Sequence, residues 1–136
     1  MWNSLETRLL NALPRIADRN GKNSIVPSVR KLSDEWVERI AEMHDYAAYE
    51  DDWDGQGAAA LPNDLSSNAF DLASALRANG VAAPSCVVPG VNGSMSLEWL
   101  LGEEKSIEIE VTGADSAEVF IYAPQKPVTY WEMRVK

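Results

Sequence analysis

Hydrophobic residues recur at two different spacings along this 136-residue chain. Up to about residue 80 they return every three to four positions, which is typical of helices that bury one face. From about residue 85 they alternate with polar residues, which is typical of strands in a sheet with one buried face. The pattern therefore predicts an α+β fold with about three N-terminal helices followed by an antiparallel β-meander of about five strands.

The helical part of the pattern divides into three segments. The first is a short amphipathic helix over residues 1–13, followed by a connector rich in turn-forming residues. The second covers residues 33–50 and begins at Ser33, whose hydroxyl suits the N-cap position of a helix. Its expected buried stripe is Trp36, Val37, Ile40, Met43 and Ala47. The third begins near Pro62 and ends before Gly80, a residue type that commonly terminates helices.

The alternating part predicts five strands and the turns between them. The strand segments are CVVP, SMSLEWL, KSIEIEV, AEVFIYA and VTYWEMRV. Asn92-Gly93, between the first two segments, is a strong hairpin signal. We expect the helices to cover one face of this meander and to leave the other face open.

The loop between the second and third strand segments sets their register. A three-residue loop at residues 102–104 places Trp99 opposite Ile107 on the buried face. The same register places Glu98 opposite Glu108 on the open face. The sequence therefore predicts a direct pair of like charges across two neighbouring strands.

Three glutamates follow from this alternation as candidate binding residues. Glu98, Glu108 and Glu110 are expected to form an acidic stripe on the open face. Carboxylates directly opposite each other destabilise a sheet slightly, by less than about 1 kcal/mol. A protein keeps such a stripe as a solvated surface or to meet a cation, a metal ion or a basic partner, and these interpretations stay open.

The fourth strand segment, AEVFIYA, does not reveal which of its faces is buried. Either Val119 and Ile121 or Phe120 and Tyr122 can point toward the core, because both pairs are apolar enough. If Phe120 and Tyr122 lie on the open face, they add aromatic neighbours that suit a binding surface.

The stretch EDDWDGQGAAALP, residues 50–62, has some features of a calcium-binding loop. Asp52, Asp54 and Gly55 match the third, fifth and sixth positions of such a loop. The twelfth position, which should be a bidentate glutamate, is Leu61. We therefore predict a structural turn and no metal site.

The glycines and the tryptophan of this stretch support the same interpretation. Gly55 and Gly57 allow the chain to leave one helix sharply and to fold back. Trp53 is expected to be the apolar anchor that holds the loop on the core. Trp53, Asp52 and Asp54 are nevertheless candidate partner-binding residues, as the place to seek the interaction if the acidic stripe is only a solvated face.

Residues 50–111 carry a set of short motifs. They are W-D-G-x-G-A, a proline shortly after it, an alanine-rich helix, N-G-x-x-x-L-E-W and an I-E-I-E strand. The matching residues are Trp53, Asp54, Gly55, Gly57, Ala58, Pro62, Pro84, Pro89, Asn92, Gly93, Leu97, Glu98, Trp99, Ile107 and Glu108. This set resembles a family of short, mostly uncharacterised bacterial proteins. The resemblance implies a shared scaffold and no particular activity.

Charge is distributed unevenly along the chain. Residues 1–31 hold six basic and two acidic residues, and the remaining residues hold six basic and nineteen acidic ones, which gives the net charge of −9. We therefore expect a basic helix and connector at residues 1–32 and an acidic α+β domain at residues 33–136, both in one structural domain. An acidic body repels phosphate and attracts basic surfaces, so a basic protein is the expected partner. Nucleic acid would bind only through the basic N-terminal segment.

The expected compartment is the cytoplasm. The chain shows no secretory signal, its one cysteine, Cys86, cannot form an intramolecular disulfide, and no run approaches the roughly 20 apolar residues that span a bilayer. We expect no membrane contact and no cofactor. The single histidine, His44, is expected to be a boundary residue of the second helix.

The residues thus favour a small protein-binding module over an enzyme. We predict stoichiometric binding to a basic protein, of the antitoxin, immunity or inhibitor kind. The alternatives are a carboxylate-dependent hydrolase or metal-binding protein, and a nucleic-acid binder that uses the basic N-terminal segment. A hydrolase would need a cleft that raises the pKa of one carboxyl, and a chain of this length has little material for both cleft and core.

Overall fold

The computed structural model describes residue 11, residues 34–102 and residues 104–134. The elements are α2 (Asp34–Ala47), α3 (Asn63–Ala78), β1 (Cys86–Pro89), β2 (Met95–Leu100), β3 (Ser106–Val111), β4 (Ser116–Tyr122) and β5 (Thr129–Arg134). The expected α+β fold is confirmed, but the described residues contain two helices and not about three. The first expected helix lies, apart from Asn11, outside the described residues, as does the boundary expected between residues 32 and 33.

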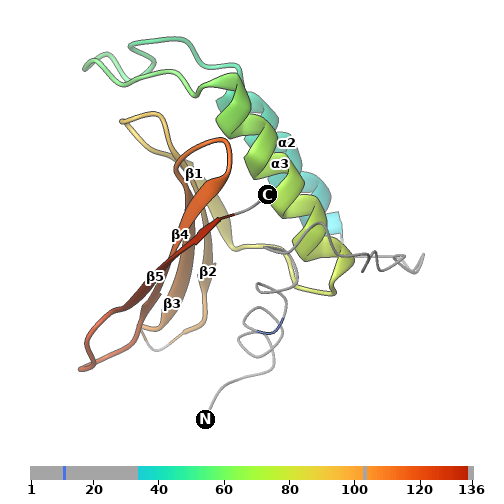
Figure 1. Cartoon of the computed structure of the whole chain (residues 1–136), viewed down its shortest axis with the longest axis vertical. Helices are drawn as coiled ribbons and strands as arrows, with labels where there is room; N and C mark the ends of the chain where they lie inside the picture. Colours follow the sequence, from blue (N-terminus) through green and yellow to red (C-terminus); the bar gives the residue numbers. More distant parts are fainter. Residues whose placement is uncertain (1–10, 12–33, 103, 135–136) are drawn as a thin grey trace.

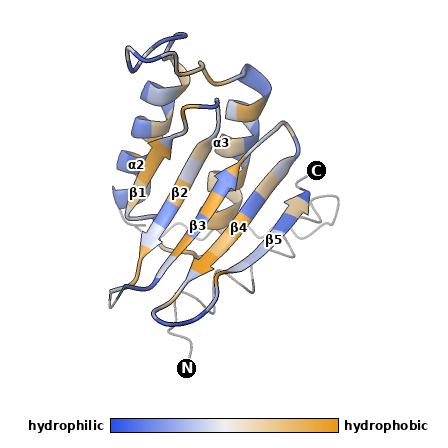
Figure 2. Cartoon of the chain, turned by 90° about the vertical axis from the view of Figure 1, so that its left-hand side faces the viewer, coloured by the Kyte–Doolittle hydropathy of each residue, from blue (hydrophilic) through white to orange (hydrophobic). Residues whose placement is uncertain are grey.

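The five strands form one antiparallel sheet in the order β1-β2-β3-β4-β5, which confirms the expected meander. Both helices lie on the same face of this sheet (Figure 1). Helix α2 packs against α3 and β1, and α3 packs against β3. Figure 2 shows the opposite face of the sheet in front of the helices, with no described helix over it. No helix within the described ranges is long and apolar enough to cross a membrane.

The register between β2 and β3 is the one that the loop length predicts. Trp99 lies opposite Ile107, and Glu98 lies opposite Glu108. The amide of Leu101 donates a hydrogen bond of 2.9 Å to the carbonyl oxygen of Lys105, and the three loop residues lie between Leu101 and Lys105. The loop length therefore determines which side chains of both strands share a face.

The structure resolves the ambiguity of β4. Val119 and Ile121 point into the core, whereas Phe120 and Tyr122 lie on the open face. Helix α3 anchors the turn before β4. The buried side chain of Asn68 on this helix donates hydrogen bonds to the carbonyl oxygens of Gly113, at 2.9 Å, and Ser116, at 3.4 Å.

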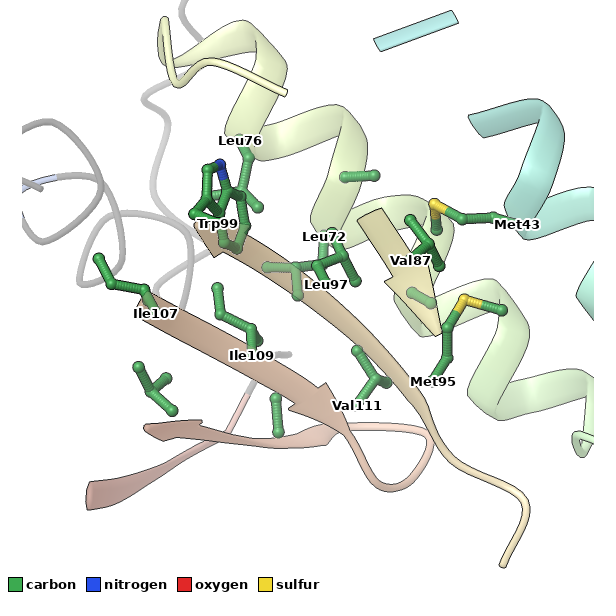
Figure 3. Close-up of a cluster of buried hydrophobic side chains, with 14 of the residues drawn as sticks. Met43, Leu72, Leu76, Val87, Met95, Leu97, Trp99, Ile107, Ile109 and Val111 are labelled. Atoms are coloured by element: carbon green, nitrogen blue, oxygen red, sulfur yellow. The ribbon is translucent and has the colours of Figure 1, made fainter. Parts of the chain in front are cut away.

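The core lies between the two helices and the inner face of the sheet (Figure 3). Its largest fully buried side chains are Trp99, Met43, Leu72, Leu76, Met95, Leu97, Ile107, Ile109, Val111 and Val119. Two buried tryptophans also fix the segment that joins α3 to β1. The indole N–H of Trp36 donates to the carbonyl oxygen of Val81 at 2.8 Å, and that of Trp99 donates to Ala82 at 2.9 Å. These bonds satisfy the polar end of each buried ring.

The buried hydrophobic residues of α3 recur at helical spacing: Leu65, Ala69, Leu72, Ala73 and Leu76. The helix ends at Ala78. Gly80, two residues later, has a φ of +81°, and the amide of Val81 donates back to the carbonyl oxygen of Leu76 at 3.0 Å. In α2, Trp36 and Met43 are buried as expected, but the prediction for Val37 is wrong, because its side chain is 54% exposed. A residue adjacent to Trp36 is turned by about 100° around the helix axis and here points to solvent.

Candidate functional site

Five glutamates share the open face of the sheet. They are Glu98 on β2, Glu108 and Glu110 on β3, Glu118 on β4 and Glu132 on β5. We call them the acidic face. The three glutamates predicted from the sequence, Glu98, Glu108 and Glu110, are thus on one face, where they alternate with buried residues of the core.

The strand registers place these carboxylates beside one another across the sheet. Glu98 is the direct neighbour of Glu108. Glu110 is the neighbour of Glu118, and Glu118 is the neighbour of Glu132, so three glutamates form a row across β3, β4 and β5. Each such pair of like charges opposes folding by a fraction of a kcal/mol, so about 1 kcal/mol is involved in total.

Neutral hydroxyl groups hold most of these carboxylates. Ser96 Oγ donates to Glu108 Oε2 at 2.9 Å, and Ser94 Oγ donates to Glu110 Oε2 at 2.7 Å. The hydroxyl of Tyr130 lies 3.3 Å from Glu118 Oε2 and 3.1 Å from Glu132 Oε2. A hydroxyl orients a carboxylate but leaves its charge in place, so the face stays negative.

Basic residues are nearly missing from the strands that carry the acidic face. Among the residues of β1 to β5, Arg134 is the only basic one. It lies at the end of β5, with its Nη1 3.7 Å from Asp115 Oδ2. The described strands therefore present five carboxylates on this face against one cation, which is already paired at the rim.

Aromatic rings border the carboxylates on β4 and β5. The centroids of Phe120 and Tyr122 are 6.1 Å apart, and those of Phe120 and Tyr130 are 5.0 Å apart. Partial burial, followed by the hydrogen bond to Glu132 and the charge of Glu118, raises the pKa of Tyr130 to about 12. Burial and the charge of Glu108 also raise the pKa of Tyr122 above its ordinary value. Both hydroxyls therefore stay protonated donors at neutral pH.

Cys86 lies at the β1 end of the same face. Its Sγ is 3.6 Å from Glu98 Oε1, which makes the thiol a weak donor to that carboxylate. Burial, followed by the negative charge of Glu98, raises the pKa of the Cys86 thiol. A thiol with a raised pKa is a poor nucleophile at neutral pH, so Cys86 has the features of a structural residue of the face.

The acidic loop at residues 50–62 is a turn organised by hydrogen bonds to its own aspartates. Asp52 accepts the amide of Gly57 at 2.7 Å, and Asp54 accepts the amides of Gln56 at 2.8 Å and Ala58 at 3.0 Å. These bonds to Asp54, that of Gln56 foremost, lower the pKa of its carboxyl. Aspartates that accept backbone amides in this way organise a turn, in agreement with the structural interpretation of the loop.

Trp53 differs from the expectation in its packing partner. Its side chain is half-buried and lies outside the hydrophobic core, and the indole N–H donates to Ala59 of the same loop at 3.0 Å. The ring packs against Tyr49, with centroids 5.2 Å apart. Trp53 therefore anchors the loop on Tyr49 and not on the core.

The structure does not bring the two sets of candidate residues together. The loop with Asp52, Trp53 and Asp54 joins α2 to α3 and lies beyond one end of the strands (Figure 1). It contacts the β1–β2 turn, where the amide of Ala59 donates to the carbonyl oxygen of Val91 at 2.9 Å. The acidic face and the acidic loop are therefore separate surfaces.

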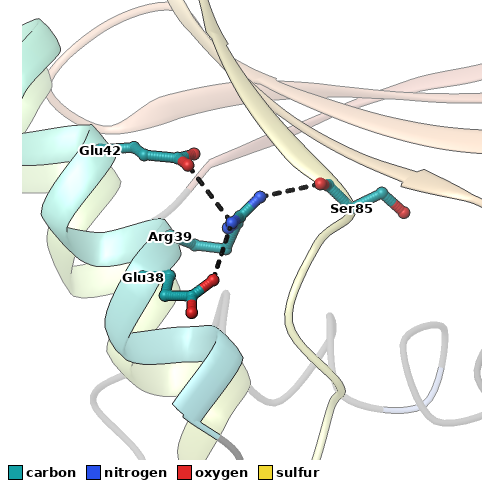
Figure 4. A network of polar contacts seen from close by, with 4 residues as sticks. All are labelled: Glu38, Arg39, Glu42 and Ser85. Carbon is teal, nitrogen blue, oxygen red and sulfur yellow. Dashed lines mark hydrogen bonds and ion pairs between the residues drawn. The ribbon is translucent and has the colours of Figure 1, made fainter.

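A cation of α2 is engaged in a local network on the helix side of β1 (Figure 4). Arg39 Nη1 donates to the carbonyl oxygen of Ser85 at 2.9 Å, and its Nη2 lies 3.2 Å from Glu42 and 3.3 Å from Glu38. The guanidinium thereby ties α2 to the segment before β1. Its role in this network is structural.

Neither a metal centre nor an enclosed carboxylate pair is present among the described residues. They contain no group of three or more His, Cys, Asp or Glu residues able to hold a metal ion. Glu98 and Glu108 are partly exposed on the open sheet face, so this carboxylate pair is not enclosed. His44 is exposed on α2 and stacks on Phe70 of α3, with ring centroids 4.3 Å apart, far in the fold from the acidic face.

Comparisons with protein-family models, with curated proteins and with solved structures found no match to this chain. The resemblance of residues 50–111 to a family of short bacterial proteins therefore stays a prediction.

Sequence reasoning did not single out Glu118, Glu132 and Tyr130 as members of the face. The alternation in AEVFIYA and VTYWEMRV contains them, but their side depends on how β4 pairs with β3. Once Val119 is placed opposite Ile109, Glu118 must lie on the open face, and Glu132 follows from β5. The missing signal was therefore the register of β4 on β3 and of β5 on β4.

Proposed function

We propose that this protein is an acidic binding module, of the antitoxin, immunity or inhibitor kind, which binds a basic protein partner stoichiometrically through the open face of its sheet. The observation that carries the proposal is the set of five glutamates on β2 to β5 with only Arg134, paired at the rim, as a cation on those strands. Such a field attracts a basic surface and speeds its encounter.

The cost of the acidic face supports a functional reason for it. Like charges in neighbouring positions reduce stability, and the chain keeps three of them in one row across β3 to β5. A basic partner removes this repulsion when it binds. A partner with exposed phosphates is disfavoured, because the face repels phosphate.

We also propose that the partner is met in the cytoplasm, since Cys86 is the only cysteine and the fold uses no disulfide. The acidic loop serves mainly as a turn in this proposal, and Trp53, Asp52 and Asp54 form a secondary contact area at the end of the sheet.

The proposal is tested by capture with a matched pair of variants. The first variant carries Gln at Glu98, Glu108 and Glu110. The control replaces three exposed acids outside the face, Asp45→Asn, Glu50→Gln and Asp64→Asn, and so has the same net charge. A protein that co-purifies with the parent chain from the native cell is then purified, and its association rate is measured with each variant.

We expect the first variant to associate at least about tenfold more slowly than the control at low salt, and the difference to shrink at high salt. Equal rates for the two variants would refute the assignment of the binding surface to the acidic face.

A further inference from the structure

Where the acidic face crosses β4 and β5, aromatic side chains and glutamates lie next to one another. Phe120 is the cross-strand neighbour of Glu108 on one side and of Tyr130 on the other. Glu118 precedes Phe120 by two residues and therefore points to the same side of the strand. Tyr130 is 47% exposed, so its ring is accessible from solvent.

The tyrosine hydroxyls connect the two kinds of group. Tyr122 donates to Glu108 Oε1 at 3.4 Å, and Tyr130 lies within 3.3 Å of both Glu118 and Glu132. Each carboxylate is thus held at the edge of an aromatic ring. A cation that sits over a ring here finds a carboxylate within reach of its own hydrogen-bond donors.

We infer that this end of the face recognises arginine side chains of a protein partner, with the guanidinium plane stacked on Phe120 or Tyr130 and its N–H groups directed to Glu108, Glu118 or Glu132. The inference rests on the proposed function and specifies the chemistry of the partner. Arginine fits better than lysine, because a guanidinium is planar, stacks on rings and can pair with a carboxylate through two parallel hydrogen bonds. Lysine is a compact, strongly hydrated charge.

Charge complementarity and geometry favour a protein segment that carries arginines over a second copy of the chain and over a metal ion. A second copy of the chain docked through the same face would bring five more glutamates against these five, which electrostatics disfavours. A metal ion needs several oxygens around one point, whereas these glutamates are distributed over separate strands and no described group of acids is suited to a metal. The occupant is therefore a segment of another protein that carries arginines.

The test compares two peptides of equal charge and length, acetyl-(Arg-Gly)₄-amide and acetyl-(Lys-Gly)₄-amide. Each is titrated into the full-length isotope-labelled protein, and amide chemical shifts report both the affinity and the place of binding. We expect shifts on β3, β4 and β5, and about threefold to tenfold tighter binding of the arginine peptide, as cation–π stacking predicts.

Four variants separate the contributions of the rings and of the carboxylate. Phe120→Leu should reduce the preference for arginine, whereas Phe70→Leu, which removes a half-buried ring on α3, should retain it. Tyr130→Leu at an exposed position provides the same test if Phe120→Leu does not fold. Glu118→Gln should weaken the binding of both peptides.

The outcomes distinguish this inference from the proposed function. If both peptides shift β3, β4 and β5 with equal affinity, the preference for arginine is wrong while binding of a basic partner stands. If neither peptide shifts these strands, both the inference and the assigned surface are wrong. An arginine preference that survives both ring substitutions would also overturn the inference.

Discussion

Gly93 in the β1–β2 turn lies against the carbonyl oxygen of Ala60 in the acidic loop. A Cβ atom on Gly93 would be 3.2 Å from that oxygen, and the φ of Gly93 is +86°. Two stretches that are more than thirty residues apart in the chain therefore meet at a position where a side chain is both strained and crowded. These are the stretches that carry the W-D-G-x-G-A and N-G-x-x-x-L-E-W motifs.

Gly93→Ala is predicted to lower the free energy of unfolding by about 2–3 kcal/mol, from backbone strain together with crowding. Gly102→Ala is the matched control, because Gly102 has a φ of +83° but no atom within 4 Å of the added methyl group. It should cost about 1 kcal/mol from strain alone. Urea unfolding measures both values. Equal losses in the two variants would show that the Ala60 contact has no effect on stability.

Glu108→Gln is predicted to leave the fold intact and to raise the free energy of unfolding by a few tenths of a kcal/mol, because it removes the repulsion from Glu98 directly opposite. The glutamine oxygen can still accept the hydrogen bond from Ser96. Thermal and urea unfolding provide the measurement. A loss above about 1 kcal/mol would mean that the charge of Glu108 is needed for the hydrogen-bond network.

The titration of Tyr130 gives a prediction for alkaline pH. Its folded-state pKa, about 12, is above the unfolded value near 10. The stability that this raised pKa contributes is therefore complete below pH 10 and is lost as the pH rises toward 12. Tyrosinate absorbance should show a late-titrating group that moves to lower pH in Glu132→Gln. No movement in this variant would mean that Glu132 is not the partner of Tyr130.

Asp54 gives the opposite dependence at acidic pH. Because the amides of Gln56 and Ala58 lower its pKa, the carboxylate contributes stability that is present above its unfolded pKa, near 4, and is lost as the pH falls below it. The deficit of Asp54→Ala should therefore be larger at pH 7 than at pH 3. Glu50→Ala, an exposed acid of the same loop, should have little effect at pH 7.

The same loop should not respond to calcium. Its aspartates already accept backbone amides, so millimolar calcium or magnesium should leave the melting temperature unchanged. A melting temperature that rises with metal in the parent chain and not in Asp52→Asn/Asp54→Asn would contradict the structural interpretation of the loop.

Much of the fold is determined by local patterns that the sequence shows directly. Alternation in SMSLEWL and KSIEIEV, together with a three-residue loop, places Trp99 opposite Ile107 and Glu98 opposite Glu108. These results need only the period of two in a strand and the length of one loop. The termination of α3 just before Gly80 likewise depends on one residue that tolerates a positive φ.

Tertiary structure decided the features that depend on pairing between distant segments. AEVFIYA is apolar on both faces, so its side chains were assigned only when β4 paired with β3 and the buried Asn68 on α3 held the turn between them. That pairing brought Phe120, Glu118 and, through β5, Tyr130 to the acidic face. The exposure of Val37 also depends on how α2 packs on the rest of the fold. Trp53 instead packs locally, on Tyr49 four residues before it. A sequence pattern gives the period of a side-chain row, but the partner that covers one side of the row is chosen by the free energy of packing the whole chain.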